Sequence, residues 1–363
     1  MKTRFLIYIL FITILITACA GQPPPSPSIA EPTVISPPEE LQTTMTQAPT
    51  VTQPIRRVQA ITIPAPSLAN NLRGEKPERE IYILLPPSYF TSEKRYPVIY
   101  YLDGWEETSI GVPPARIDRL INQGKIQDLI VVTVTGTNSL GNSFFVNSPI
   151  NGDWEDFIVK DLLDYIDTNF RSIQDANSRA ISGFDVGGYA SLNLAMKYPD
   201  IFGSVYALDP SLFDPNGLAE FTLIFDREKP SVLAPIYGAA FSPDPNNKNY
   251  VQYPRTGNDG KLIRDEVWQR WQMGYGGPAA EIENYKENWQ KLNGIGLSYS
   301  KLAADSYLEP FLKGAAYFVE QMQAAAIPLE LKVNPMSYGS SLDTRILTEM
   351  LPFLSERLTP ESQ

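Results

Sequence analysis

A sharp turn from a strand into a helix, at residues 183–188, limits the folds open to this chain more than any other segment. The run Arg179–Ser182 leads into Gly183-Phe184-Asp185-Val186-Gly187-Gly188, and a helical stretch, Tyr189–Tyr198, follows. Glycines two positions before and two after Asp185 let the backbone turn abruptly. The sequence therefore predicts a strained Asp185 at the carboxyl edge of a sheet.

Strands and helices alternate along the rest of the globular region. Apolar runs, typical of strands buried on both faces, occupy 80–85, 96–102, 129–135, 295–299 and 329–333. Helical patterns occupy 114–123, 154–168, 310–325 and 344–358. This alternation predicts an α/β fold with a doubly wound, mostly parallel sheet.

Residues 212–290 have a different texture, rich in Pro, Asn and Gly. We expect an inserted cap over the carboxyl edge of the sheet, where open α/β folds bind ligands. Trp268, Trp271 and Tyr275 are candidates to line the ligand cleft, with flat faces suited to a sugar or an aromatic ester. Alternatively Trp268 and Trp271, three residues apart on a helix, anchor the cap to the core. We favour this alternative for at least one of them.

The first 19 residues predict export and lipid attachment. Lys2 and Arg4 precede an apolar run, Phe5–Ile16, that is too short to span a bilayer, and Ile16-Thr17-Ala18-Cys19 resembles a bacterial lipobox. Lipid on Cys19 would anchor the protein to a membrane on the extracytoplasmic side of a bacterial cell envelope. A cleaved ordinary signal peptide with an incidental cysteine is the alternative.

Residues 20–54 are rich in Pro, Ser and Thr and lack aromatic side chains, so they predict a disordered tether. The globular domain is then expected at 55–363, which is long enough for one large α/β domain with an insertion.

Composition excludes several classes of function. The chain has 41 acidic against 30 basic residues, which argues against nucleic acid as a partner. It has no histidine, and Cys19 is its one cysteine, so borderline and soft metals lack ligands. Asp244-Pro245-Asn246-Asn247 is the one local hint of calcium or magnesium, and it fits a polar loop better. We expect no cofactor and no metal.

Several segments together carry a family resemblance. In order they are Pro66–Leu68 with Arg79, Leu85–Tyr89, Tyr101–Gly104, Trp154–Ile158, Tyr165–Asp167, the turn at 183–188, Tyr198–Gly203 and Met350–Phe353. By their order and spacing, positions 60–358 resemble the esterase family that contains esterase D, enterochelin esterases, feruloyl and acetyl xylan esterases and the mycolyltransferases. The resemblance implies an α/β-hydrolase fold.

The resemblance also implies a site made of an elbow serine, an acid after a late strand and a histidine in the last loop before the final helix. Here the serine position holds Asp185, the acid position is best matched by Asp305, and the histidine segment Tyr338–Ser341 holds none. The implied oxyanion donors are the backbone amides of Val186 and of Trp105.

Donors on the backbone survive any change of side chain, so the oxyanion hole could remain intact. Asp103, just before Trp105 in the same loop, is a further candidate for the ligand cleft.

Hydrolysis by such a site needs an imidazole to take the nucleophile's proton and return it to the leaving group. Without one, a carboxylate at position 185 would fill the oxyanion hole from within. The sequence therefore predicts a catalytically degenerate esterase-type protein, a pseudoenzyme that binds a glycan, an ester or an envelope polymer.

Two catalytic alternatives stay open from the sequence. In one, Asp185 is the nucleophile of an unconventional ester hydrolase. In the other, Asp185 and Asp305 act as paired carboxylates roughly 7 Å apart. The sequence predicts no oligomeric state.

Overall fold

The computed structural model describes residues 56–105, 111–219, 221, 233–248, 250–259, 261–274 and 278–361. Cys19, the predicted tether and Tyr275 lie outside these residues, so the predictions about them are not addressed by the structure.

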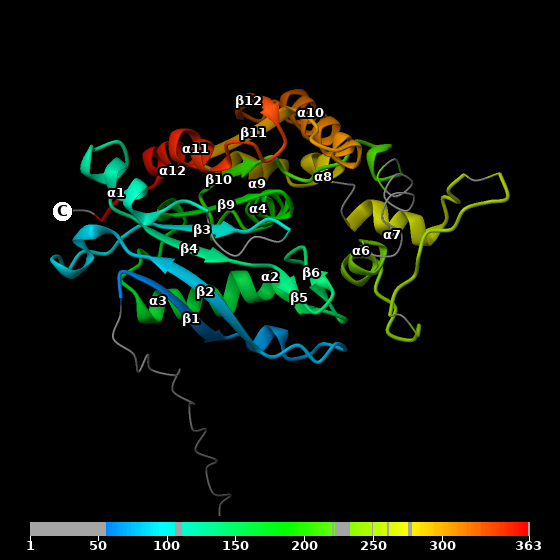
Figure 1. Ribbon diagram of the computed structural model, residues 1–363, viewed down its shortest axis with the longest axis horizontal. Coiled ribbons are helices and arrows are strands. Elements are labelled where there is room, and N and C mark those ends of the chain that lie inside the picture. The colour runs from blue at the N-terminus through cyan, green and yellow to red at the C-terminus, as the bar shows by residue number, and fades with distance from the viewer. Residues whose placement is uncertain are drawn as a thin grey trace, which may run out of the picture. The chain divides into compact units, whose positions relative to one another are not determined.

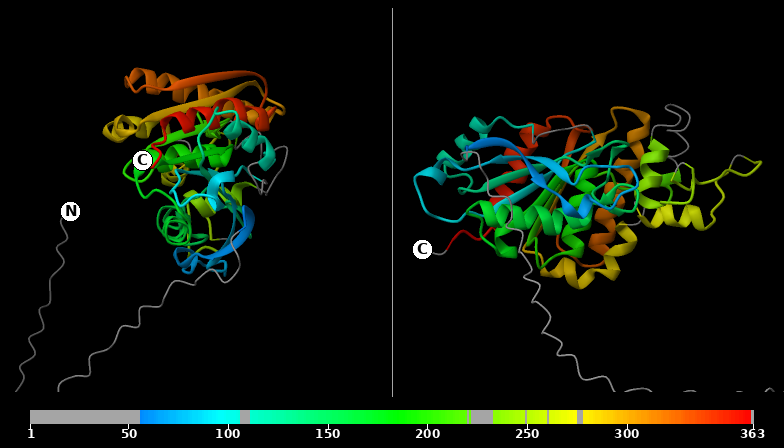
Figure 2. Two further views of the ribbon diagram at one scale, coloured as in Figure 1. Left: turned by 90° about the vertical axis from the view of Figure 1, so that its left-hand side faces the viewer. Right: turned by 90° about the horizontal axis from the view of Figure 1, so that it is seen from below.

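Eight of the described strands form one sheet, in the order β1-β2-β4-β3-β9-β10-β11-β12 (Figures 1 and 2). Their bounds are β1 Val58–Pro64, β2 Glu78–Leu84, β3 Val98–Leu102, β4 Ile130–Val134, β9 Arg179–Phe184, β10 Ser204–Leu208, β11 Gly294–Leu302 and β12 Glu330–Ser337. Only β1–β2 and β2–β4 pair antiparallel; the other neighbours are parallel. The predicted mostly parallel sheet is confirmed.

Each central strand is buried because helices cover both faces of the sheet. In β3 all five residues are fully buried, and successive side chains join opposite apolar clusters, Tyr100 on one face and Tyr101 on the other. Figure 2 shows the sheet from the blue strands of β1 and β2 at one edge to the orange β12 at the other. The edge strands β1 and β12 are half exposed, which is why β1 escaped the sequence-based prediction.

Helices supply the two covering layers. The first face is covered by α1 Pro114–Asn122, α11 Leu342–Arg345 and α12 Leu351–Arg357. The second face is covered by α3 Leu163–Asn169, α4 Val186–Lys197 and α10 Glu309–Ala324, with α9 Lys286–Lys291 against α4. The short 3-10 turns are η1 Pro66–Leu68, η2 Pro87–Phe90, η4 Ala176–Ser178 and η5 Ser306–Leu308.

Two of the predicted helices contain a π-helical segment. The helix expected at 154–168 is observed as α2 Trp154–Asp156, η3 Phe157–Leu162 and α3. The helix expected at 344–358 runs through α11, η6 Ile346–Met350 and α12. In both places the apolar side of the helix was predicted from its spacing, and the wider turn inside it was not.

Residues 212–290 contain the helices of the expected cap region. They are α6 Leu233–Phe241, α7 Glu266–Gly274 and α8 Pro278–Asn284. Two small hairpins, β5 Thr137–Asn138 with β6 Gly141–Asn142 and β7 Asn147–Ser148 with β8 Gly152–Asp153, follow β4. A Cβ atom on Gly141 would lie 2.9 Å from Ile236 and 3.8 Å from Trp105, so α6 packs beside the loops that follow β3 and β4.

Among the residues that the structure describes, none of the helices is both long and apolar enough to cross a bilayer.

Candidate functional site

Asp185 occupies the tight turn between β9 and α4. Its backbone has φ 55° and ψ −119°, a conformation that side-chain-bearing residues rarely adopt. A Cβ at Gly183 would lie 2.4 Å from the Gly187 carbonyl, and a Cβ at Gly187 would lie 2.0 Å from the Leu102 carbonyl oxygen. Both positions therefore require glycine, and the turn points Asp185 out of the carboxyl end of the sheet.

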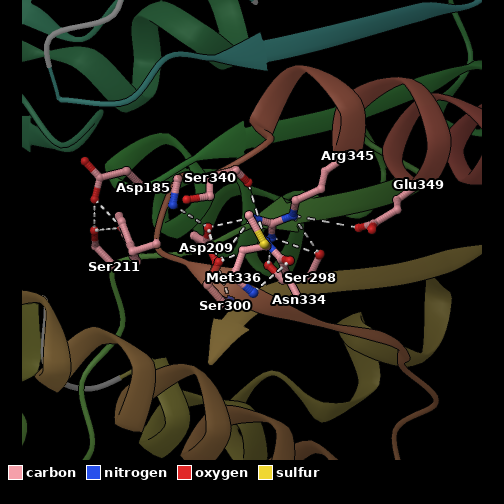
Figure 3. Close-up of polar contacts among 12 residues, drawn as sticks. Asp185, Asp209, Ser211, Ser298, Ser300, Asn334, Met336, Ser340, Arg345 and Glu349 are labelled. Carbon is pink, nitrogen blue, oxygen red and sulfur yellow. Dashed lines mark hydrogen bonds and ion pairs between the residues drawn. The ribbon is translucent and has the colours of Figure 1, made fainter. Parts of the chain in front are cut away.

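The Asp185 carboxylate accepts hydrogen bonds from four donors. The Ser211 hydroxyl and the Tyr338 hydroxyl both donate to Oδ1, the latter at 2.7 Å. The backbone amides of Val186 and Trp105 also donate to the carboxylate. Figure 3 shows Asp185 and Ser211 on one side of the cluster. The two amides are those for which the family resemblance implies the role of oxyanion donors, and here both donate to the side chain of residue 185.

Burial and hydrogen bonding act in opposite directions on Asp185. Burial raises its pKa above the usual value, and the hydrogen bonds from Ser211, Tyr338, Val186 and Trp105 offset only part of that increase. All four donors point at one acceptor group, which is the arrangement of a bound anion rather than of a free nucleophile.

Tyr338 is the member of the segment Tyr338–Ser341 whose side chain reaches Asp185. Its ring lies 5.6 Å from that of Phe184, and its backbone amide donates to Leu302 at 2.8 Å. Burial and the nearby carboxylates of Asp185 and Asp209 raise the pKa of Tyr338 well above its usual value. The phenol therefore stays protonated at neutral pH and cannot replace an imidazole as the base.

A second carboxylate, Asp209, lies next to the same loop and forms a buried ion pair (Figure 3). Its Oδ2 is 2.6 Å from Arg345 Nη1 and accepts from the Gly339 amide at 2.9 Å. Its Oδ1 accepts from the Ser300 amide at 2.6 Å. The Arg345 guanidinium also donates to the Ser298 carbonyl at 2.9 Å. Asp209 is 0% and Arg345 4% exposed at the side chain, so each charge depends on the other.

The structure does not bring Asp305 into this cluster. Asp305 is exposed at the start of η5, and its side chain caps no backbone amide there. The carboxylate that contacts the segment Tyr338–Ser341 is Asp209, through the Gly339 amide, and the expectation that Asp305 lies there is wrong. The pairing of Asp185 with Asp305 is not observed.

The position of Asp209 could have been predicted from the sequence, because Asp209 directly follows an apolar strand next to β9. Leu208 and Phe184 are directly paired neighbours at the ends of β10 and β9, so Asp209 and Asp185 leave adjacent parallel strands at the same edge. The run Ser204–Leu208 is apolar and fully buried, yet it was not assigned as a strand. Arg345 had no such signal, because its partner lies 136 residues away in the sequence.

The three described candidates for the ligand cleft, Asp103, Trp268 and Trp271, are buried. Trp268 and Trp271 are each 2% exposed, and Trp271 stacks on Tyr237 with ring centroids 5.8 Å apart. Both tryptophans therefore pack in the interior and anchor α7, which is the alternative favoured for at least one of them, and the expectation that they line the cleft is wrong. Asp103 is fully buried at the end of β3. Trp105 stays half exposed against Phe144.

Among the described residues, no three carboxylates or other ligand side chains lie close enough together to hold a metal ion.

Comparison with known proteins supports the class that this geometry suggests. The model of the family described as "Putative esterase" matches residues 75–291. This match covers more than half of the chain, and the protein therefore belongs to that esterase family.

Individual relatives are more distant. An esterase of Mycobacterium tuberculosis is 30% identical over 136 residues, which cover 34% of this chain and 27% of the relative. An endo-1,4-beta-xylanase/feruloyl esterase of Xylanibacter ruminicola is 29% identical over 133 residues, 35% of this chain and 18% of the relative. The chain thus matches about a quarter or less of the length of these proteins.

Solved structures are similar over most of the chain. A ferulic acid esterase superposes with a TM-score of 0.57 at 22% identity, covering 84% of this chain and all of the other. An S-formylglutathione hydrolase from Agrobacterium tumefaciens gives 0.54 at 16% identity, covering 85% and 99%. These similarities confirm the α/β-hydrolase fold.

The buried pair predicts an uneven response to arginine substitutions. Arg345→Met leaves the Asp209 charge without its cation, so we expect a loss of about 3–5 kcal/mol in the free energy of unfolding. The matched control is Arg255→Met, whose ion pair with Asp265 is 70% exposed at the arginine. Its effect should be far smaller. Urea unfolding of both variants measures the difference, and equal losses would contradict this account of the Asp209–Arg345 pair.

Proposed function

We propose that this protein is a catalytically inactive member of the esterase family, anchored by lipid on Cys19 outside the cytoplasm and retained for binding at the cell envelope. The observation that carries the proposal is the Asp185 carboxylate, which accepts hydrogen bonds from both amides expected to bind an oxyanion. A substrate carbonyl would have to displace a covalently attached competitor before it could be polarised.

The remaining polar groups do not offer an alternative route. Covalent catalysis by Asp185 would need a base to activate water, and the sequence contains no histidine. Tyr338 donates to Asp185 and, with its raised pKa, remains a phenol. Asp209 is held by Arg345 and by two backbone amides. Asp185 and Asp209 are thus both already occupied by donors.

Hydrolysis assays test the loss of activity. The full-length protein, purified in mild detergent, should release no p-nitrophenol above background from short-chain or long-chain p-nitrophenyl esters. Asp185→Ala and Asp185→Ser should behave in the same way, because neither restores a base. Thermal unfolding confirms that each variant is folded. Turnover by the wild type that disappears in Asp185→Ala would instead show that the carboxylate is a working nucleophile.

Occupation of the oxyanion hole by Asp185 has its own test. Asp185→Gly suits the positive φ of the turn and leaves two amides and two hydroxyls without their acceptor. Added formate should bind there and stabilise this variant. At ten times its Kd the gain is about 1.4 kcal/mol, a rise in Tm of about 2–4 °C.

Sodium chloride at the same ionic strength is the control for formate, and the wild type is the control for the site. A wild type that responds to formate as strongly as Asp185→Gly would show that the hole is open to begin with.

The anchor is tested by lipid labelling in a bacterial host. Cys19 is the only cysteine, so an alkyne-tagged palmitate probe can reach a thiol at no other position. We expect the wild type to be labelled and recovered with membranes, and Cys19→Ser to lose the label and become soluble. Membrane recovery that Cys19→Ser leaves unchanged would contradict the lipoprotein assignment.

A further inference from the structure

A pocket of about 440 Å³ is lined by residues of α4 and of the cap helices α6 and α8. Small-molecule sites in proteins typically measure about 300–1,000 Å³. The lining residues lie on α2, α4, α6, α8 and β7 or next to β7 and α9, and Asp185 is not among them.

One wall of the pocket is a stripe along α4. Tyr189, Asn193 and Lys197 follow each other at intervals of four residues, so they share one face of the helix. The rest of α4 is buried almost throughout, and Asn193 and Lys197 are its half-exposed residues. The half-exposed polar side chains of α4, Asn193 and Lys197, therefore both face this pocket.

Part of the wall is held rigidly by its own contacts. Glu155 accepts from Lys197 at 2.8 Å on one oxygen and from the Tyr198 hydroxyl at 2.7 Å on the other. The Asn147 amide is bonded at both ends to Asp156, as acceptor at 3.1 Å and as donor at 3.3 Å. These groups shape the pocket and have little capacity left for a ligand.

Three other lining residues retain hydrogen-bonding capacity. Within the described part of the chain, no hydrogen bond involves the side chains of Asn193 or Tyr285. Glu281 uses one oxygen to accept from Asn284, at 3.3 Å. Asn193 offers a donor and an acceptor side by side, the Tyr285 hydroxyl can act as either, and Glu281 accepts. Such a balanced set matches hydroxyl groups, each of which both donates and accepts.

The rest of the lining is flat and apolar. Tyr189, Phe241 and Tyr285 contribute rings, and Tyr189 meets Phe241 edge to face with centroids 6.3 Å apart. Aromatic faces pack against apolar C–H surface while the tyrosine hydroxyl remains available to polar groups. A ligand with one apolar face and a rim of hydroxyls fits this combination.

The charges in the pocket select against anions. Glu155 and Lys197 offset each other, which leaves the Glu281 carboxylate. The whole chain carries a net charge of −11. A phosphate or carboxylate ligand would therefore meet repulsion, whereas a neutral ligand would not.

We propose that this pocket binds a short neutral saccharide, with Asn193, Tyr285 and Glu281 bonding its hydroxyls and the aromatic rings packing on its apolar face. This site is additional to the closed elbow, and it stands or falls independently of whether Asp185 has any catalytic role.

Calorimetric titration of the full-length protein in mild detergent tests the proposal. The probes are xylobiose, cellobiose and N,N′-diacetylchitobiose, with digalacturonate as the anionic comparator and ferulate as the non-sugar comparator. We expect at least one neutral disaccharide to bind, and Asn193→Ala to raise its Kd about 3- to 10-fold through the loss of one or two hydrogen bonds.

The matched control is Asn122→Ala, an exposed helical asparagine at the end of α1 on the opposite face of the sheet, which should leave Kd unchanged. If Asn193→Ala lowers the Tm, the change in Kd is measured with Tyr285→Phe instead, because that variant removes a single oxygen and should disturb the fold less.

Three results would overturn the proposal. They are the absence of binding by all three neutral sugars, a Kd unaffected by both Asn193→Ala and Tyr285→Phe, and binding confined to digalacturonate or ferulate.

Discussion

The hydrogen bonds to the Asp185 carboxylate join four segments that are remote in the sequence. Trp105 follows β3, Val186 begins α4, Ser211 follows β10, and Tyr338 follows β12. Buried donors must find an acceptor, and here one carboxylate serves all of them. The positive φ of Asp185 costs backbone conformational energy, and the hydrogen bonds to its carboxylate offset that cost. The loops at the carboxyl edge thus share one acceptor, the Asp185 carboxylate.

The ion pair of Asp209 with Arg345 performs a related role one strand further along the sheet. Asp209 extends from β10, and Arg345 reaches it from α11 across Ser298 and Ser300 of β11. A buried carboxylate beside the last loop would otherwise need a cation from another source, since the chain contains no histidine. The neighbouring carboxylates therefore differ in their means of compensation. Asp185 is stabilised by neutral donors, and Asp209 by a full positive charge.

The sequence was most informative where a local pattern determines structure. The glycines at 183 and 187 predicted the turn, and continuous apolar runs predicted the central strands, because both signals arise within a few residues. It was least informative where partners are brought together by the fold. The ion pair spans 136 residues, and the burial of Trp268 and Trp271 depends on how α7 packs against Tyr237 and its surroundings. The resemblance placed the acid at Asp305 from its position in the chain. The register of β9 with β10 instead brings Asp209 to the same sheet edge as Asp185.

A site whose donors are all committed to its own side chain has nothing to offer a ligand's oxygen. Under the proposed binding function, recognition would use groups whose hydrogen bonds are not already made inside the protein. In the described part of the chain, Asn193 and Tyr285 meet that condition within one pocket, beside aromatic rings and a single uncompensated carboxylate. Asn193 lies two turns along the helix that starts at Asp185. Helix α4 therefore carries the occupied elbow at its start and, two turns later, the face that lines the proposed saccharide pocket.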